Sequence, residues 1–222
     1  AGVPADALHL LPGDGPSVGA ALVRDPRTDG VAFTGSVETA RLINRALADR
    51  ASAIAPLIAE TGGQNVMIVD STALPEQVID DVVVSAFRSA GQRCSALRVL
   101  FLQREVSARI LAMLAGAVDE LSVGDPALLE TDVGPVIDDE AKANLEAHAA
   151  AMERRGRLVC EAALPPECGH GTFFAPRAFE IESMALLERE VFGPILHVIT
   201  YSADRLDAVI DAVNGTGFGL TL

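Results

Sequence analysis

The sequence predicts an α/β protein with mostly parallel sheets, organised as two domains. Short apolar runs of strand length alternate with helical stretches, which is the order of successive strand–helix–strand units. Two of these runs lead directly into glycine and then into a residue suited to begin a helix or a turn. The 222 residues, half of them hydrophobic, suffice for one or two packed domains. We therefore expect a partial, doubly wound first domain followed by a second α/β domain.

The first domain is predicted to span residues 1–62. Its apolar runs are separated by glycine-rich turns, and its longer helix shows apolar residues on one face from Val37 to Leu47. Gly35 makes the turn before that helix, and Ser36 is a natural N-cap. The expected strands and helices, in order, are an opening apolar run at 8–11, a helix at 17–23, a strand at 30–34, the helix that follows Ser36, and a strand at 56–59.

The second domain is predicted to span residues 63–222, because the sequence pattern of the chain changes after the glycine pair Gly62-Gly63. The helix expected at 74–89 is apolar on nearly every side, so it should be buried. The helix expected at 138–155 is acidic at its start and basic at its end, and Gly156 follows it. The remaining expected elements are strands at 65–69, 97–102, 179–181 and 195–200 and helices at 106–121 and 206–213.

The charge and the cysteines limit the classes of function. The chain carries 17 basic and 31 acidic residues, a net charge of −14, and has no basic stripe. Nucleic acid and anionic membranes are therefore poor partners. No apolar run is long enough to cross a bilayer, and the first 13 residues lack the basic leader of a signal peptide. Three widely spaced cysteines argue against a disulfide framework and for a reducing, cytoplasmic compartment.

Cys94 is the leading candidate for a nucleophile. It is expected on an irregular turn, beside Arg93, between the end of a helix and the start of a strand. The thiolate is the reactive form of cysteine, and a nearby cation lowers the pKa of a thiol. The alternative is that Cys94 is a small buried hydrophobic residue, which is the commoner role of a single cysteine.

Ser36 and Glu60 are expected at the same edge of the first sheet. Each follows or ends a strand, and ligands in parallel α/β sheets bind at the carboxyl ends of the strands. Free N–H groups at the start of the helix after Ser36 would suit a phosphate. The alternatives are an ordinary capped helix and, for Glu60, a surface carboxylate that caps or forms a salt bridge.

We expect no metal site. Cys160, Cys168 and His170 lie near one another in the sequence. Their spacing matches no zinc pattern, and a fourth ligand is absent.

Four stretches follow one another along the chain: Phe33-Thr34-Gly35-Ser36, Glu60-Thr61-Gly62-Gly63, Gly91-Gln92-Arg93-Cys94 and Glu190-Val191-Phe192-Gly193-Pro194. Taken together and in this order, they resemble the aldehyde dehydrogenase superfamily. The chain has Thr61 and Gln64 where most members have leucine and lysine. In these two residues the chain is similar to the glutamate-semialdehyde (pyrroline-5-carboxylate) dehydrogenase branch. Within it, the chain is most similar to an internal fragment of the dehydrogenase part of bifunctional proline utilisation proteins.

The resemblance implies a reaction at Cys94 and Glu60. Cys94 would attack the aldehyde to give a thiohemiacetal, which becomes a thioester after hydride leaves. Glu60 would act as general base for the water that hydrolyses the thioester. The Cys94 N–H is an implied oxyanion donor, and Ser95 is a candidate contact for the carboxylate of the substrate.

The resemblance also implies NAD as the cofactor. Gly35 and Ser36 match the contacts on the pyrophosphate side, and Gly62 lies where the backbone approaches the nicotinamide. Glu190 matches the residue that accepts hydrogen bonds from the nicotinamide ribose, and Phe192 packs beside the ring.

The implied partners are a small aldehyde, other copies of the full-length chain in a homo-oligomer, and a proline dehydrogenase domain in the same chain. Two alternatives stay open: an aldehyde dehydrogenase of another substrate branch, and a non-catalytic domain that keeps the fold for assembly. A cysteine phosphatase is disfavoured because Arg98 follows Cys94 too closely to cradle a phosphate, and no histidine stands in an obvious protease motif.

Overall fold

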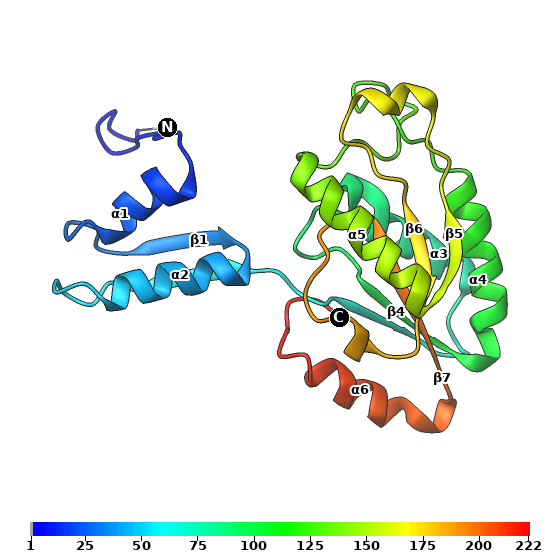
Figure 1. Cartoon of the computed structure of the whole chain (residues 1–222). Coiled ribbons are helices and arrows are strands. Elements are labelled where there is room, and N and C mark those ends of the chain that lie inside the picture. The colour runs from blue at the N-terminus through cyan, green and yellow to red at the C-terminus, as the bar shows by residue number, and fades with distance from the viewer. Residues whose placement is uncertain (1) are drawn as a thin grey trace. The chain divides into compact units, whose positions relative to one another are not determined.

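The chain divides into two compact units, of which one ends at Gly62 and the other begins at Gly63. The computed structural model describes residues 2–222. Each unit is an α/β arrangement with parallel strands, as Figure 1 shows for both. Within the described residues, no helix is long and apolar enough to cross a membrane.

The first unit contains a parallel pair of strands. Strand β1 (Val31–Gly35) pairs with β2 (Leu57–Thr61), and the register places Thr34 opposite Glu60. Helix α2 (Val37–Ala48) connects the two strands. A short π-helical turn (Gly15–Gly19) and helix α1 (Ala20–Arg24) precede them. The expected strand at 8–11 is not formed, since these residues have no regular structure in the chain as described.

Ser36 begins α2 as the sequence predicts. Its backbone is extended, and its side-chain oxygen accepts a hydrogen bond from the Thr39 N–H at 3.1 Å. Such a cap satisfies one of the N–H groups that the first turn of a helix leaves without partners. The strand therefore passes into the helix within one residue of Gly35.

The second unit contains a five-stranded sheet with the strand order β3-β4-β7-β6-β5. Three of the four neighbouring pairs are parallel, and only β5 runs antiparallel to its neighbour β6. The bounds are β3 (Val66–Val69), β4 (Val99–Gln103), β5 (Arg157–Glu161), β6 (Arg177–Glu180) and β7 (Ile195–Tyr201).

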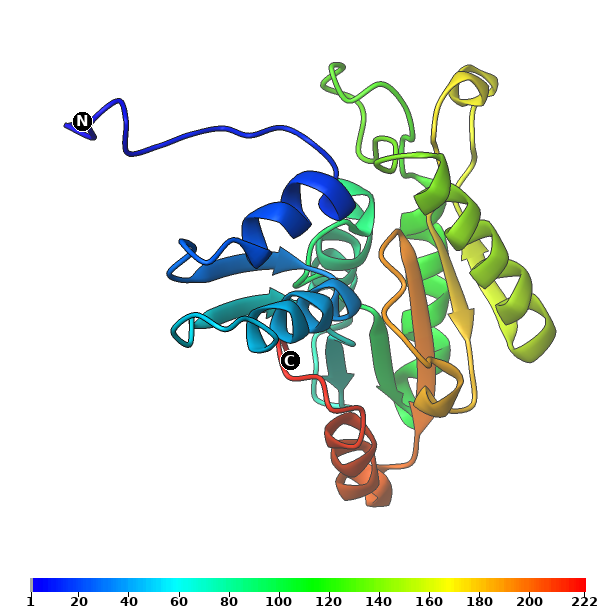
Figure 2. The same ribbon diagram turned by 60° about the vertical axis from the view of Figure 1, so that its left-hand side comes forward.

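Helices cover both faces of this sheet. Figures 1 and 2 show α5 (Asp139–Arg155) on one face and α3 (Pro75–Val82) with α4 (Arg104–Asp119) on the other. Helix α6 (Leu206–Asn214) follows β7. Every residue of β4 is buried, and six of the seven residues of β7 are buried, as expected of parallel strands with helices on both faces.

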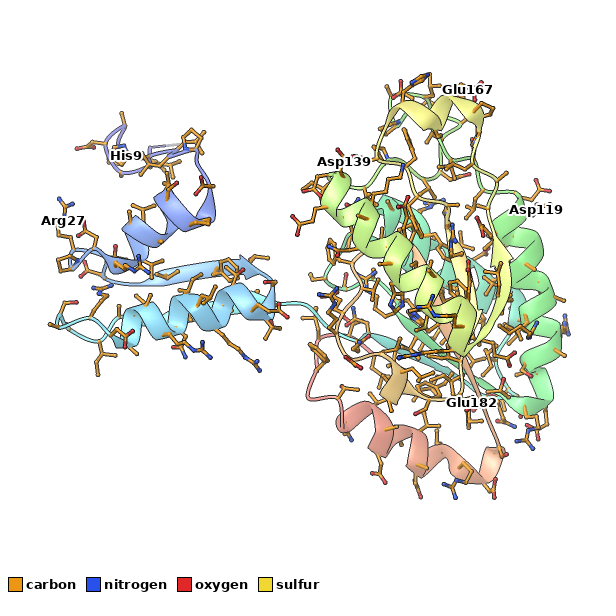
Figure 3. The ribbon with its side chains drawn as sticks, viewed as in Figure 1. His9, Arg27, Asp119, Asp139, Glu167 and Glu182 are labelled. Carbon is orange, nitrogen blue, oxygen red and sulfur yellow. The ribbon has the colours of Figure 1, made fainter. Side chains whose placement is uncertain are left out.

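Helix α5 confirms the expected charge pattern. Asp138 caps it by accepting from the Ala141 N–H, and Asp139, labelled in Figure 3, lies in its first turn. Acidic residues at this end are favoured by the helix dipole. Gly156 ends the helix with an extended backbone rather than in the left-handed region, and a Cβ there would lie 2.5 Å from the carbonyl oxygen of Glu180. Close approach to β6 therefore explains this glycine.

The expected helix at 74–89 is helical to Phe87, but it does not stay α-helical and it ends two residues earlier than expected. Helix α3 ends at Val82, a π-helical turn covers Val83–Phe87, and a short 3-10 segment covers Arg88–Gly91. The apolar pattern continues through Val83, Ala86 and Phe87, of which the last two are fully buried, so it does not indicate the change of backbone. Strand β5, which begins and ends with exposed charged residues, was not expected either.

Candidate active site

The chain approaches Cys94 through a strained backbone. Ser89, Ala90 and Gly91 have φ values of 57°, 52° and 62°, which lie in the left-handed region. This region costs a non-glycine residue about 1–2 kcal/mol. Strain of this kind persists only where the surroundings impose it, and it clusters at functional sites. The segment reverses the chain immediately before the thiol.

Cys94 lies on a hydrogen-bonded turn formed by residues 93–96, and we call residues 91–96, which lead into and form it, the Cys94 turn. The Ala96 N–H donates to the Arg93 carbonyl at 3.0 Å and closes the turn. The buried side chain of Asn65 donates to the carbonyl oxygens of Cys94 and Ala96, at 2.6 and 2.8 Å. The amide that begins the second unit therefore fixes the backbone that carries the thiol.

The thiol itself is exposed, as is the neighbouring Ser95. Among the described residues, the hydrogen bonds of the turn leave the Cys94 N–H without an acceptor. An unpaired N–H beside a nucleophile is the group that an oxyanion site needs. The expectation of a buried, purely structural cysteine is therefore not met at this position. Cys168, by contrast, is buried.

Arg93 contributes its side chain to the preceding turn rather than to open solvent. Its guanidinium donates to the carbonyl oxygens of Val84 and Ser85, at 2.6 and 3.3 Å. These carbonyls belong to the π-helical turn after α3. The arginine next to the thiol thus ties the Cys94 turn to the element that delivers it.

A second segment, residues 189–194, lies against the first, and we call it the Glu190 loop. The buried side chain of Gln64 donates to the carbonyl oxygens of Leu187 and Arg189, at 3.3 and 2.8 Å. Gly91 packs directly on this loop, since a Cβ at Gly91 would lie 2.2 Å from the Gly193 carbonyl oxygen. Phe192 is about half exposed, at 45%.

Arg98 connects these two segments. Its side chain is 1% exposed, yet it carries a guanidinium. Nη1 donates to the carbonyls of Gly91 and Gly193, at 2.7 and 3.1 Å. Nη2 donates to the Arg93 carbonyl at 3.1 Å and to a carboxylate oxygen of Glu190 at 3.2 Å. Burial lowers the pKa of this guanidinium, and the carboxylate of Glu190 opposes that effect.

The backbone of Arg98 is held by the buried imidazole of His197, which in turn contacts the half-buried imidazole of His148. The Arg98 carbonyl oxygen lies 3.0 Å from Nδ1 of His197, and Nε2 of His197 lies 2.8 Å from Nε2 of His148. A carbonyl only accepts, so Nδ1 of His197 carries the hydrogen and its Nε2 accepts from His148. Burial lowers the pKa of His197 to about 3 and that of His148 to about 4, so both rings are neutral at neutral pH.

The expected site residues of the first unit lie at one edge of its sheet. Ser36 follows β1 at its carboxyl end, and Glu60 is the next-to-last residue of β2, so both lie where the two parallel strands end. Glu60 is exposed. A Cβ at Gly35 would lie 2.4 Å from the ring of Phe33, so a side chain there would require that ring to move. Gly62 follows β2 at the boundary of the unit.

The structure thus brings together Cys94, Ser95, Glu190 and Phe192 in the second unit, and Gly35, Ser36 and Glu60 in the first. The sequence reading missed Arg98, Asn65 and Gln64 as parts of the site, although each is a buried polar residue. The only feature of the sequence that could have indicated them is the pair of amide residues, Gln64 and Asn65, directly after Gly63. Within residues 2–222, no group of three or more His, Cys, Asp or Glu side chains is arranged to hold a metal ion.

The chain belongs to the aldehyde dehydrogenase family, which it matches over residues 1–222. It is 56% identical over 225 residues to the bifunctional protein PutA of Rhizobium meliloti, covering all of this chain and 18% of that protein. The chain spans 17% to 18% of the length of the PutA relatives from four bacteria.

Solved structures show the same likeness. Proline utilization A (PutA) of Bradyrhizobium japonicum, as the D779W mutant, superimposes with a TM-score of 0.94 and 55% identity, over 99% of this chain and 22% of that one. A 1-pyrroline-5-carboxylate dehydrogenase from Thermus with bound NAD gives a TM-score of 0.86 and 34% identity, over 95% of this chain and 42% of that one.

Proposed function

We propose that this chain is part of an NAD-dependent dehydrogenase that oxidises L-glutamate γ-semialdehyde, the open form of pyrroline-5-carboxylate, to L-glutamate. The observation that carries the proposal is an exposed thiol on a braced turn, Cys94, in a chain more than half identical to PutA proteins. The named activity of the Thermus relative supports the substrate branch. In this proposal residues 1–62 belong to the NAD-binding domain and residues 63–222 to the catalytic domain.

Cys94 supplies the nucleophile in the proposed mechanism. Its thiolate forms a bond to the aldehyde carbon, and the carbonyl oxygen becomes an oxyanion that the Cys94 N–H can stabilise. Ser95, exposed next to it, is placed to contact the carboxylate of the substrate. The bond to sulfur holds the carbon at one position until the thioester has formed.

Glu60 acts as the base of the second half-reaction. It removes a proton from water, the water oxygen attacks the thioester carbon, and the carbon–sulfur bond breaks to release glutamate and the thiolate. This role requires Glu60 and Cys94 to face a common space in the working enzyme, which is itself part of the proposal.

The chain offers residues that fit NAD. The start of α2 after Gly35 and Ser36, at the carboxyl ends of parallel strands, suits a diphosphate. The carboxylate of Glu190 can accept hydrogen bonds from ribose hydroxyls, with Phe192 half exposed beside it, and Gly62 would allow close approach of the backbone. When bound, NAD supplies the acceptor for the hydride of the aldehyde carbon.

The wider setting is also part of the proposal. The name "bifunctional" of the PutA relatives suggests a proline-oxidising domain in the same full-length chain, and we propose that this chain works within a homo-oligomer. The three cysteines form no disulfide in the chain as described, which suits a reducing, cytoplasmic compartment.

The test uses the full-length protein that carries this chain. NADH formation is measured with glutamate semialdehyde and with simple aliphatic aldehydes, for the native protein and for Cys94→Ala. We expect a clear preference for the semialdehyde and loss of at least about a thousandfold in kcat for Cys94→Ala, because the nucleophile is gone. Normal turnover by Cys94→Ala would refute the assignment of the nucleophile, and a preference for aliphatic aldehydes would refute the substrate.

A further inference from the structure

We propose that Arg98 is a positioning residue that locks the Cys94 turn to the Glu190 loop, so that one buried guanidinium holds the nucleophile and the proposed cofactor contact in register. The inference rests on the proposed function of Cys94 and Glu190. It adds a residue that touches neither substrate nor cofactor but sets the distance between the groups that do.

The first argument is the set of acceptors. The two terminal nitrogens of Arg98 reach four oxygens, two from each segment: the carbonyls of Gly91 and Arg93, and the Gly193 carbonyl with the Glu190 carboxylate. Glu190 lies 92 residues away along the chain, so only the folded unit creates this arrangement. The guanidinium also lies over the ring of Phe192, with Cζ 5.2 Å from its centroid.

The second argument is burial. The side chain of Arg98 is 1% exposed and that of Glu190 is 18% exposed, so this pair is shielded from solvent, unlike most surface ion pairs. A buried guanidinium is costly unless hydrogen bonds satisfy it. Moving either segment away would break two of the four bonds at once, so the arrangement resists displacement of each segment.

The third argument is that the base of the side chain is itself held. The Arg98 N–H donates to the Asn65 carbonyl, and the Arg98 carbonyl accepts from the backbone N–H and ring of His197. Asn65 also holds the Cys94 turn through its side chain. The guanidinium therefore projects from a fixed point of the sheet, which is what a positioning residue requires.

The geometry demands arginine rather than a positive charge alone. Lysine is a point charge with one nitrogen, whereas arginine presents a planar fork whose nitrogens bond different partners simultaneously. A lysine in place of Arg98 could keep the ion pair with Glu190 or the carbonyl contacts, but one nitrogen cannot occupy both positions of the fork. The conservative variant Arg98→Lys thus separates positioning from charge.

The experiment compares the full-length native protein with Arg98→Lys and Arg98→Met. Arg157→Lys is the matched control, since Arg157 also pairs with a carboxylate, Glu180, but its side chain is 64% exposed. The measurements are kcat, KM for NAD, the melting temperature, and hydrogen exchange in residues 88–97 and 189–194.

In Arg98→Lys we expect a protein that still folds, with a lowered melting temperature because buried carbonyl oxygens lose their donors, and a kcat about 100-fold lower because the thiol is misplaced. KM for NAD should rise about tenfold, because Glu190 loses its fixed orientation. Hydrogen exchange should increase in both segments. Arg98→Met should show the same changes more strongly, and Arg157→Lys should show none of them.

Native kcat and KM in Arg98→Lys, or faster exchange in only one segment, would overturn the inference. If Arg98→Met does not fold, Arg98→Lys decides the matter, and failure of both to fold would assign Arg98 a purely structural role and overturn it too. If the native protein forms no NADH from the semialdehyde, the proposed function fails, but hydrogen exchange in the two segments still decides whether Arg98 locks them.

Discussion

The side chain of Asn65 donates to the carbonyl oxygen of Cys94 at 2.6 Å, from the residue before β3 to a turn 29 residues further along the chain. The same amide nitrogen donates to the Ala96 carbonyl at 2.8 Å. Both carbonyls face one NH2 group, so the turn depends on a donor at this position. A residue that presents an acceptor there should repel the turn.

Asn65→Asp tests this dependence. The carboxylate keeps the shape of the amide but faces two carbonyl oxygens in a buried place, so we expect a loss of about 3 kcal/mol in the free energy of unfolding and at least a tenfold fall in kcat. In the full-length protein, unfolding of this unit in urea can be followed by hydrogen exchange in the peptides that carry residues 93–103. Asn144→Asp, at an exposed position on α5, is the control. Equal effects of the two changes would contradict the assigned role.

Gly91→Ala tests the contact between the two segments. The new Cβ would lie 2.2 Å from the Gly193 carbonyl oxygen, at a φ of +62°, so backbone must shift. We expect a loss of at least about 2 kcal/mol in the free energy of unfolding. Gly116→Ala, in α4 with nothing within 4 Å, should instead stabilise by about 0.5–1 kcal/mol. The result is read from urea midpoints, and a native midpoint for Gly91→Ala would show that the segments separate freely.

The lowered pKa values of His197 and His148 predict a loss of stability in mild acid. Burial lowers the pKa of His197 to about 3 and that of His148 to about 4, while an unfolded histidine has a pKa of about 6.5. Between these values the unfolded state binds more protons, so their contribution is fully present above pH 6.5 and is lost as the pH falls toward 4 for His148 and toward 3 for His197. From pH 7 to pH 5 we expect His197 to cost about 2 kcal/mol, and the partly exposed His148 less.

His197→Asn measures this contribution. The asparagine amide can still donate to the Arg98 carbonyl but does not titrate. The difference between the unfolding free energies at pH 7 and pH 5 should therefore shrink by about 2 kcal/mol. His170→Asn, at an exposed position, should leave the native difference in place. If His197→Asn keeps that difference as well, another group is responsible for it.

Alkylation should distinguish the three cysteines. Cys94 is exposed, Cys168 is buried, and burial raises the pKa of the Cys160 thiol to about 11. At pH 7.5 only roughly one Cys160 in several thousand is then a thiolate. In the native full-length protein, iodoacetamide should label Cys94 before the other two cysteines. Enzyme activity should fall in proportion to the labelling of Cys94, and bound NAD should slow that labelling. Mass spectrometry of the labelled peptides gives the order, and labelling of Cys160 ahead of Cys94 would be incompatible with the proposed site.

Local patterns were sufficient for much of the fold. The cap at Ser36 follows from residue type and position, and the strands β4 and β7 follow from short runs rich in apolar and β-branched residues. The left-handed residues after α3 were not predictable, because nothing in Ser89 or Ala90 favours that conformation. It is imposed by packing, as the fully buried Ala86 and Phe87 just before them indicate.

The candidate site was predictable where chemistry identifies a residue and not where tertiary contacts do. Cys94 is recognised by its type and its turn. Arg98 looks like a surface charge in the sequence, because its acceptor Glu190 is 92 residues away. Asn65 and Gln64 are likewise defined by carbonyls that only the folded unit places beside them.

The left-handed segment before Cys94 also has a consequence for proteolysis. Arg88 and Arg93 flank it, and trypsin cleaves after arginine. Arg88 is exposed, whereas Arg93 is held by the carbonyls of Val84 and Ser85. Trypsin should therefore cleave the native chain after Arg88 before it cleaves after Arg93. Cleavage after Arg93 then reports that the hydrogen bonds of its side chain, and with them the Cys94 turn, have opened.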